Sequence, residues 1–136
     1  MFTLAGGIIS WKSKKKTCIT HSIMESEFVA LASTGQEAEW LRDLLIEIPL
    51  ASKNVSKVSI HCHSQTTLAR AYSKVFNRKS RHISLRHEYV RKLINDGIIS
   101  LTFVRSSYNL ADPFTKSLTR DLVKKFSRGM RLKLLE

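Results

Sequence analysis

The sequence predicts an α/β fold in which strand-like and helix-like segments alternate along the chain. Apolar residues recur at every second position in 58–62 and 98–106, which is typical of strands. They recur at helical spacing in 21–48 and 77–97, which is typical of amphipathic helices. With 136 residues and a hydrophobic share of 43%, the chain has enough apolar material for one globular domain, so a single domain over 1–136 is expected.

The amino-terminal part predicts a hairpin followed by a long helix. In residues 2–20 the Gly6-Gly7 pair separates two β-prone runs, which is a hairpin signal. Ser22 with Glu25 three residues later fits a capping box, and Pro49 stops the helix. Trp40 is expected to pack into the core. The apolar stripe of this helix comprises Phe28, Leu31, Ala32, Ala38, Leu41, Leu44, Leu45 and Ile48.

The remaining elements follow in the order strand, helix, helix, strand, loop and helix. Residues 58–74 read as a strand that ends in a polar turn and continues as a helix. Gly97 ends the helical pattern of 77–97, whose apolar side is expected to be Leu85, Tyr89, Val90, Leu93 and Ile94. Residues 109–118 are expected to form a loop, in which Pro113 interrupts regular secondary structure. A basic amphipathic tail covers 119–135.

The charge balance points to a polyanionic partner. The chain carries 23 Lys and Arg against 11 Asp and Glu, a formal net charge of +12, and nucleic acid is the first expectation. A basic surface that serves only solubility is the open alternative. The basic helix supplies the expected nucleic-acid-binding residues, which are Arg78, Lys79, Arg81, His82, Arg86, His87, Arg91 and Lys92. A solvated helix face is the alternative for this run.

Cysteine usage and apolar runs indicate the compartment. Cys18 and Cys62 have no C-x-x-C spacing, so neither a disulfide framework nor a zinc site is indicated. A signal-peptide core and an apolar run long enough to span a membrane are both missing from this sequence. We therefore expect an intracellular chain, cytoplasmic or nuclear, with no membrane partner.

Three polar residues lie at positions where an α/β fold commonly places catalytic or metal-binding side chains. Glu27 lies in the first turns of the long helix, His63 ends one strand, and Asp112 follows the other strand. Helix starts and strand ends are where such folds place carboxylates for magnesium, which prefers oxygen ligands. The alternatives are that Glu25 and Glu27 favour the helix start electrostatically and that Asp112 is a turn residue before Pro113.

Four stretches, "ISWKSKKKTCITHSIMESEFVALASTGQEAEWLRDLL", "VSIHCHSQTTLARA", "SRHISLRHEYVRKLINDGIISLTFV" and "NLADPFTKSL", resemble a known family in order and spacing. That family is the ribonuclease H domain of the Pol polyprotein of copia-type long-terminal-repeat retrotransposons. The resemblance implies a five-stranded mixed sheet in the order 3-2-1-4-5, flanked by helices. It implies two-metal, Mg²⁺-dependent hydrolysis of the RNA strand of an RNA–DNA hybrid, alongside the reverse transcriptase portion of Pol.

The resemblance also implies four metal-binding carboxylates, two of which are matched. Glu27 in "EFVA" matches the helix glutamate, with Glu25 as the other register, and Asp112 in "LADP" matches the last aspartate. His63 stands where the family has an aspartate, and imidazole is a poor magnesium ligand. The first-strand aspartate has no counterpart.

These departures shape the expected fold and function. The expected fold is a ribonuclease H-like mixed sheet flanked by helices that lacks the first, central strand, so the domain is truncated at its amino terminus. The expected function is that of a retrotransposon-derived ribonuclease H-like domain that is inactive here. A non-catalytic nucleic-acid-binding module and a decayed element fragment are the alternatives.

Overall fold

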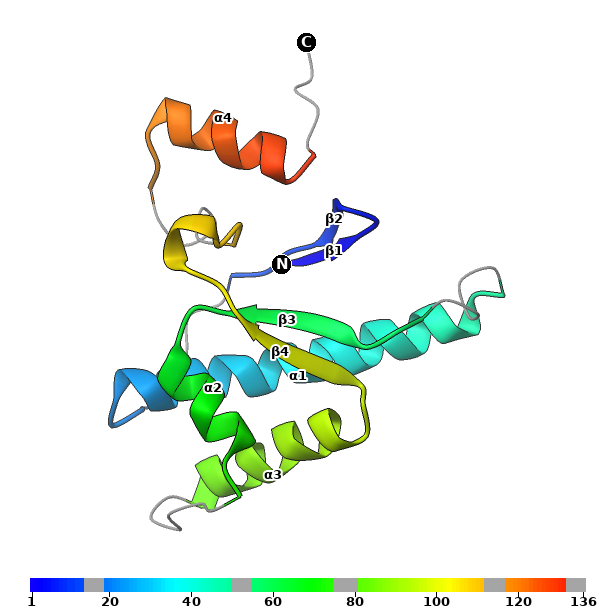
Figure 1. Ribbon diagram of the computed structural model, residues 1–136, viewed down its shortest axis with the longest axis vertical. Helices are drawn as coiled ribbons and strands as arrows, with labels where there is room; N and C mark the ends of the chain where they lie inside the picture. The colour runs from blue at the N-terminus through cyan, green and yellow to red at the C-terminus, as the bar shows by residue number, and fades with distance from the viewer. Residues whose placement is uncertain (14–18, 50–54, 75–80, 112–116, 132–136) are drawn as a thin grey trace. The chain divides into compact units, whose positions relative to one another are not determined.

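The computed structural model describes residues 1–13, 19–49, 55–74, 81–111 and 117–131. Within these ranges the α/β prediction is confirmed, with four α-helices and two two-stranded sheets (Figure 1). The chain divides into two compact units, Met1–Cys18 with Arg105–Glu136, and Ile19–Val104, which are described separately. The single domain over 1–136 stays a prediction. Arg78, Lys79, Asp112 and Pro113 lie outside the described residues.

The first unit contains the predicted hairpin. Strands β1 (Phe2–Leu4) and β2 (Gly7–Ser10) pair antiparallel. The two residues between them, Ala5 and Gly6, have φ of 49° and 80°, the pattern of a type I′ turn, whose twist matches that of the strands. The turn is therefore Ala5-Gly6, one residue earlier than the Gly6-Gly7 pair suggested.

The same unit contains a short 3-10 helix, η2 (Ser106–Tyr108), and α4 (Arg120–Gly129). The basic tail predicted for 119–135 is thus helical over most of its described part. Met130 at its end is buried, and the Arg131 guanidinium donates through Nη1 to the Ala5 carbonyl at 3.2 Å. The hairpin turn and the end of α4 are therefore in contact.

The second unit begins with α1 (Ile23–Glu47), and its predicted cap is confirmed. Ser22 Oγ accepts the Glu25 N–H at 3.1 Å. The Glu25 carboxylate in turn accepts the His21 N–H at 2.9 Å. The first bond satisfies an N–H group that a helix start leaves without an intrahelical partner, and the second ties the residue before the cap to the first turn. The helix ends two residues before Pro49, as predicted, because the residue preceding a proline disfavours helical backbone.

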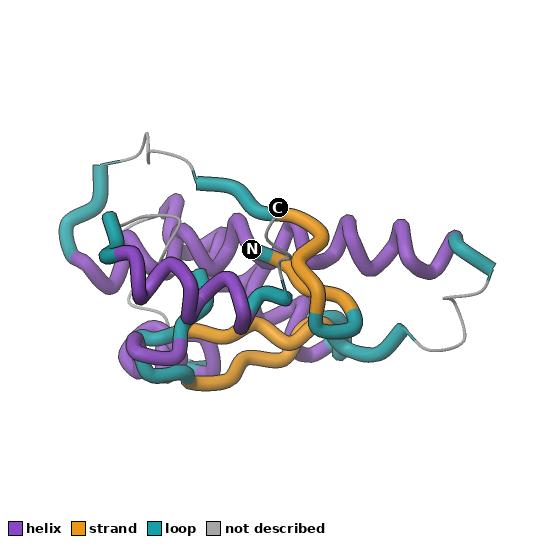
Figure 2. Tube along the Cα trace, turned by 90° about the horizontal axis from the view of Figure 1, so that it is seen from above, coloured by secondary structure: helices purple, strands orange, loops and turns teal. Residues whose placement is uncertain are grey.

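Strands β3 (Val58–Cys62) and β4 (Ile99–Phe103) form a parallel pair, in register from Val58 beside Ile99 to Cys62 beside Phe103. Between them in sequence lie α2 (Gln65–Tyr72) and α3 (Arg81–Asn95), the helical connection that parallel strands require. The long α1 runs lengthwise past the two strands (Figure 2). The largest fully buried side chains include Phe28 of α1, Leu93 of α3 and Ile99 of β4.

Several burial predictions for the helices are wrong, and Leu44 and Ile48 of the predicted apolar stripe are 42% and 44% exposed. Leu85, expected on the core side of α3, is 61% exposed, and the buried residues of this helix are Ile83, His87, Val90 and Leu93. His87, assigned to the basic surface, is only 2% exposed. Trp40, expected in the core, is 59% exposed. Gly97 ends α3 as predicted, with a φ of 69° that glycine adopts without strain.

The packing of α1 on α3 explains which side of α3 is buried. A Cβ atom at Gly35 would lie 2.9 Å from Leu93 Cδ1, so the two helices approach closely at this point. That approach turns Val90 and Leu93 inward, and Ile83 and His87 follow at helical spacing. His87 then stacks on Phe28 with ring centroids 5.9 Å apart, and its Nε2 pairs with the Arg70 carbonyl at 2.9 Å.

The described strands form two separate two-stranded sheets. Among these strands the hairpin pairs only with itself, and β3 pairs only with β4. None of the helices in the described ranges combines the length and apolar character needed to cross a membrane.

Candidate functional site

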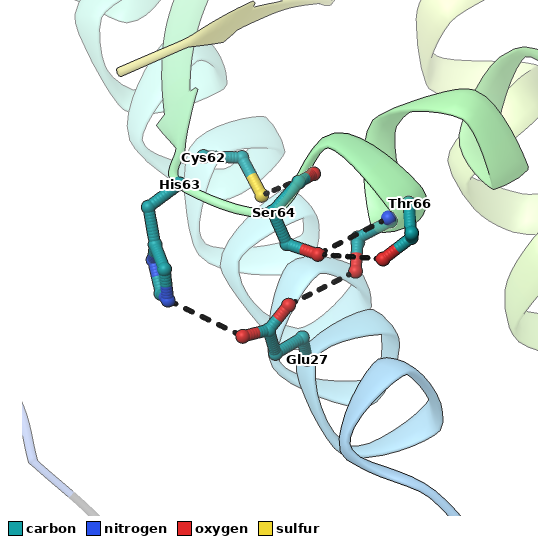
Figure 3. A network of polar contacts seen from close by, with 6 residues as sticks. Glu27, Cys62, His63, Ser64 and Thr66 are labelled. Atoms are coloured by element: carbon teal, nitrogen blue, oxygen red, sulfur yellow. Dashed lines mark hydrogen bonds and ion pairs between the residues drawn. The ribbon is translucent and has the colours of Figure 1, made fainter. Parts of the chain in front are cut away.

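Glu27 of α1 and His63 at the end of β3 meet in the second unit. Glu27 Oε1 lies 3.2 Å from His63 Nε2, and the two side chains are 24% and 44% exposed (Figure 3). The contact is an ion pair when the imidazole is protonated. The start of a helix and the carboxyl end of a parallel strand therefore bring together two of the three predicted residues. The third, Asp112, lies outside the described residues.

Thr67 holds the other oxygen of the Glu27 carboxylate, donating its hydroxyl to Oε2 at 3.2 Å. This threonine is fully buried at the start of α2. Its position is fixed by the cap of that helix, where Ser64 Oγ accepts the Thr67 N–H at 3.3 Å and pairs with Thr66 Oγ1 at 3.0 Å (Figure 3). Sequence reasoning missed Thr67, although Ser64 followed three residues later by Thr67 is the spacing of a helix cap.

Cys62 lies beside this network as a neutral thiol. Its Sγ is 3.7 Å from the Ser64 carbonyl, to which it donates. Burial raises the pKa of the Cys62 thiol, the hydrogen bond with Ser64 offsets part of that rise, and the nearby Glu27 carboxylate adds to it. A thiol must ionise to act as a nucleophile or a metal ligand. Cys62 therefore contributes packing at this site and no thiolate at neutral pH.

The two glutamates of the helix start have different partners. Glu25 accepts the His21 N–H and belongs to the helix cap. Glu27, two residues on, points toward His63 (Figure 3), and its carboxylate accepts the Thr67 hydroxyl. The geometry favours Glu27 over Glu25 as the residue that faces the strand end.

The described residues do not fit a pair of magnesium ions. Both Glu27 oxygens are engaged, one by a hydroxyl and one by an imidazole. Magnesium prefers oxygen ligands in near-octahedral geometry, and imidazole suits zinc, copper or iron better. No group of three or more His, Cys, Asp and Glu side chains that could hold a metal ion occurs in the part of the chain that the structure describes.

The basic residues of α3 do not share one face. Five of the eight predicted nucleic-acid-binding residues remain candidates, since His87 is buried and Arg78 and Lys79 lie outside the described ranges. They are Arg81, His82, Arg86, Arg91 and Lys92. At roughly 100° per residue, Arg86 and Arg91 lie about 140° apart around the helix axis. Arg86 therefore flanks the core on one side of α3 and Arg91 on the other.

Across most of its length the chain is similar to retrovirus-related Pol polyproteins of plant transposons. It is homologous to a segment of the Pol polyproteins of copia-type retrotransposons. The retrovirus-related Pol polyprotein from transposon TNT 1-94 of Nicotiana tabacum is 31% identical over 121 residues, which cover 89% of this chain and 9% of that protein.

Two further relatives come from Arabidopsis thaliana. The Pol polyprotein from transposon RE2 is 30% identical over 120 residues, and that from transposon RE1 is 28% identical over 119 residues. Each match covers 88% of this chain and 8% of the polyprotein. The chain thus spans only a small part of the length of these relatives. No family model matches the chain, and no solved structure matches it.

Proposed function

We propose that the chain is the ribonuclease H-like segment of a copia-type Pol polyprotein, and that it binds RNA–DNA hybrids without magnesium-dependent hydrolysis of the RNA strand. The observation that carries this proposal is the meeting of Glu27 and His63 at 3.2 Å. A helix start and a strand end converge where the resemblance implies two carboxylates. Glu27 supplies one of them, and the imidazole of His63 stands in place of the other.

The order of the elements supports the proposal. The hairpin corresponds to the second and third strands of the implied sheet, and β3 and β4 correspond to the fourth and fifth. The parallel pairing of β3 with β4 agrees with this assignment, because the implied order places strands four and five side by side.

The absence of hydrolysis follows from the residues at the site. Two metal ions about 4 Å apart need carboxylates that bridge them. Glu27 is bonded to His63 and Thr67, and Asp112 is the one other carboxylate that the resemblance matches. These two carboxylates are too few to hold both metal ions, so we expect no metal-dependent hydrolysis at this site.

Hybrid binding rests on charge. The net charge of +12 favours any polyanion, and contacts from Lys and Arg to phosphates supply most non-specific affinity for nucleic acids. Arg81, Arg86 and Arg91 project from three sides of α3.

A hybrid-binding titration tests this part of the proposal. We expect replacing Arg81, Arg86 and Arg91 by Ala to weaken binding of a labelled RNA–DNA hybrid. The slope of log affinity against log salt should fall by about 0.9 for each phosphate that the variant no longer binds. The matched control replaces three exposed basic residues elsewhere, Lys57, Lys74 and Arg105, by Ala. If the two triple variants lost the same affinity, or if affinity did not change with salt concentration, a role of α3 in hybrid binding would be contradicted.

A further inference from the structure

A groove between α1 and α3 contains neither Glu27 nor His63. Its volume is about 380 Å³, within the range of small-ligand sites, roughly 300–1,000 Å³. Ser33 and Gln36 line it from α1, and His82, Leu85, Arg86 and Tyr89 line it from α3. The two helices lie side by side in the second unit (Figure 1).

The polar groups of the groove favour an anion. Arg86 Nη1 donates to the His82 carbonyl at 3.0 Å, which holds the guanidinium at the groove while its planar fork has further N–H donors. No carboxylate occurs among the described residues that line the groove. The Glu39 carboxylate accepts the Tyr89 hydroxyl at 2.5 Å, and Glu39 itself does not line the groove.

The remaining lining suits a planar apolar group. Leu85 is 61% exposed, and burying so large an apolar side chain under a ligand is favourable. The Tyr89 ring adds a flat surface of the kind on which nucleic-acid bases stack. Gln36 carries an amide that both donates and accepts, which matches the edge of a base. An anion-binding end beside an apolar wall and an amide is the chemistry that recognises a nucleotide.

We infer that the groove between α1 and α3 binds one nucleotide unit of a single-stranded nucleic acid, with Arg86 at the phosphate and Leu85 and Tyr89 against the base. This inference rests on the proposed function, because it assumes a nucleic-acid-binding segment, and it adds a single-strand site to it. An acidic peptide could satisfy Arg86 but would leave the base-sized apolar wall unfilled.

The test is anisotropy of a labelled eight-residue single-stranded oligodeoxynucleotide with four proteins: the unmodified chain, Arg86→Gln, Ser33→Phe and Lys57→Gln. Arg86→Gln removes a charge-assisted hydrogen bond, so we expect about tenfold weaker binding and a salt slope lower by about 0.7. Ser33→Phe fills the groove from the α1 wall without changing charge and should weaken binding to a similar degree. Lys57→Gln removes the same charge near Gly97, beyond the end of α3, and should change affinity by less than about twofold.

Two results would overturn the inference. Equal effects of Arg86→Gln and Lys57→Gln would mean that diffuse charge alone attracts the strand. Unchanged binding by Ser33→Phe, or an acidic octapeptide that displaces the oligonucleotide at lower concentration, would exclude a nucleotide in the groove. Ser33→Phe also separates this inference from the proposed function. One combination of results would refute the groove inference and leave the proposed function standing. In that case hybrid binding depends on Arg81, Arg86 and Arg91, but Ser33→Phe leaves single-strand binding unchanged.

Discussion

Replacing His63 by Asp should destabilise the chain, because it puts a second carboxylate beside Glu27. The imidazole Nε2 now lies 3.2 Å from Glu27 Oε1. The shorter aspartate would place the two carboxylates about 5 Å apart, where Coulomb repulsion is about 1 kcal/mol in a water-like dielectric. The high dielectric is appropriate because the two side chains are 44% and 24% exposed. We therefore expect His63→Asp to be about 1 kcal/mol less stable than His63→Asn.

Urea denaturation without divalent ions measures this difference. A decrease of about 1 kcal/mol in the free energy of unfolding lowers the midpoint by roughly 0.3–1 M urea for a small protein. Salt at about 1 M should reduce the gap between the two variants, since it screens partly exposed charges. The matched controls are His61→Asp and His61→Asn, at a histidine that pairs with Thr102 on the adjacent strand. Equal unfolding free energies of His63→Asp and His63→Asn would refute repulsion between the two carboxylates. So would a difference between His61→Asp and His61→Asn as large as that at position 63.

Two further predictions concern the helices. Ser22→Ala removes the oxygen that accepts the Glu25 N–H and should cost about 1 kcal/mol of unfolding free energy in urea, whereas an unchanged midpoint would mean that the cap is dispensable. Burial and Glu39 raise the pKa of Tyr89 to about 12, above the value of about 10 in unfolded chains. Because the raised value favours the protonated phenol, its stabilisation is complete below about pH 10 and is lost as pH rises toward 12. Between about pH 9 and 11.5, the free energy of unfolding measured with urea should therefore fall less for Tyr89→Phe than for the unmodified chain. Equal decreases in the two proteins would contradict this prediction.

Local signals predicted the elements well. The capping pair Ser22 and Glu25, the alternation in 58–62 and Gly97 each act within a few residues, so the sequence contains their whole cause. The burial of α3 depends on tertiary packing instead. Its sequence has apolar residues on two sides, and hydrophobicity alone ranks Leu85 above His87. The close approach of α1 at Gly35 reverses that ranking and leaves Leu85 in solvent.

The candidate site was predictable in part for the same reason. Glu27 and His63 followed from the rule that helix starts and strand ends converge, and their contact agrees with it. The bond from Thr67 to Glu27 joins residues 40 positions apart, so no local pattern could reveal it. The choice between Glu25 and Glu27 also needed the fold, because both residues lie in the first turns of one helix. Only the direction of β3 distinguishes the residue that faces the strand end from the one that caps the helix.

Magnesium-dependent cleavage of an RNA–DNA hybrid tests the central claim most directly. Four proteins are compared: the unmodified chain, His63→Asp, the chain fused at its amino terminus to the stretch of the tobacco polyprotein that precedes the matched region, and the fusion carrying His63→Asp. Only the last carries both the preceding stretch of the polyprotein and a carboxylate at position 63, so we expect it alone to cleave the hybrid. Cleavage by the unmodified chain that disappears in Asp112→Asn, or cleavage by His63→Asp without the fusion, would contradict the account.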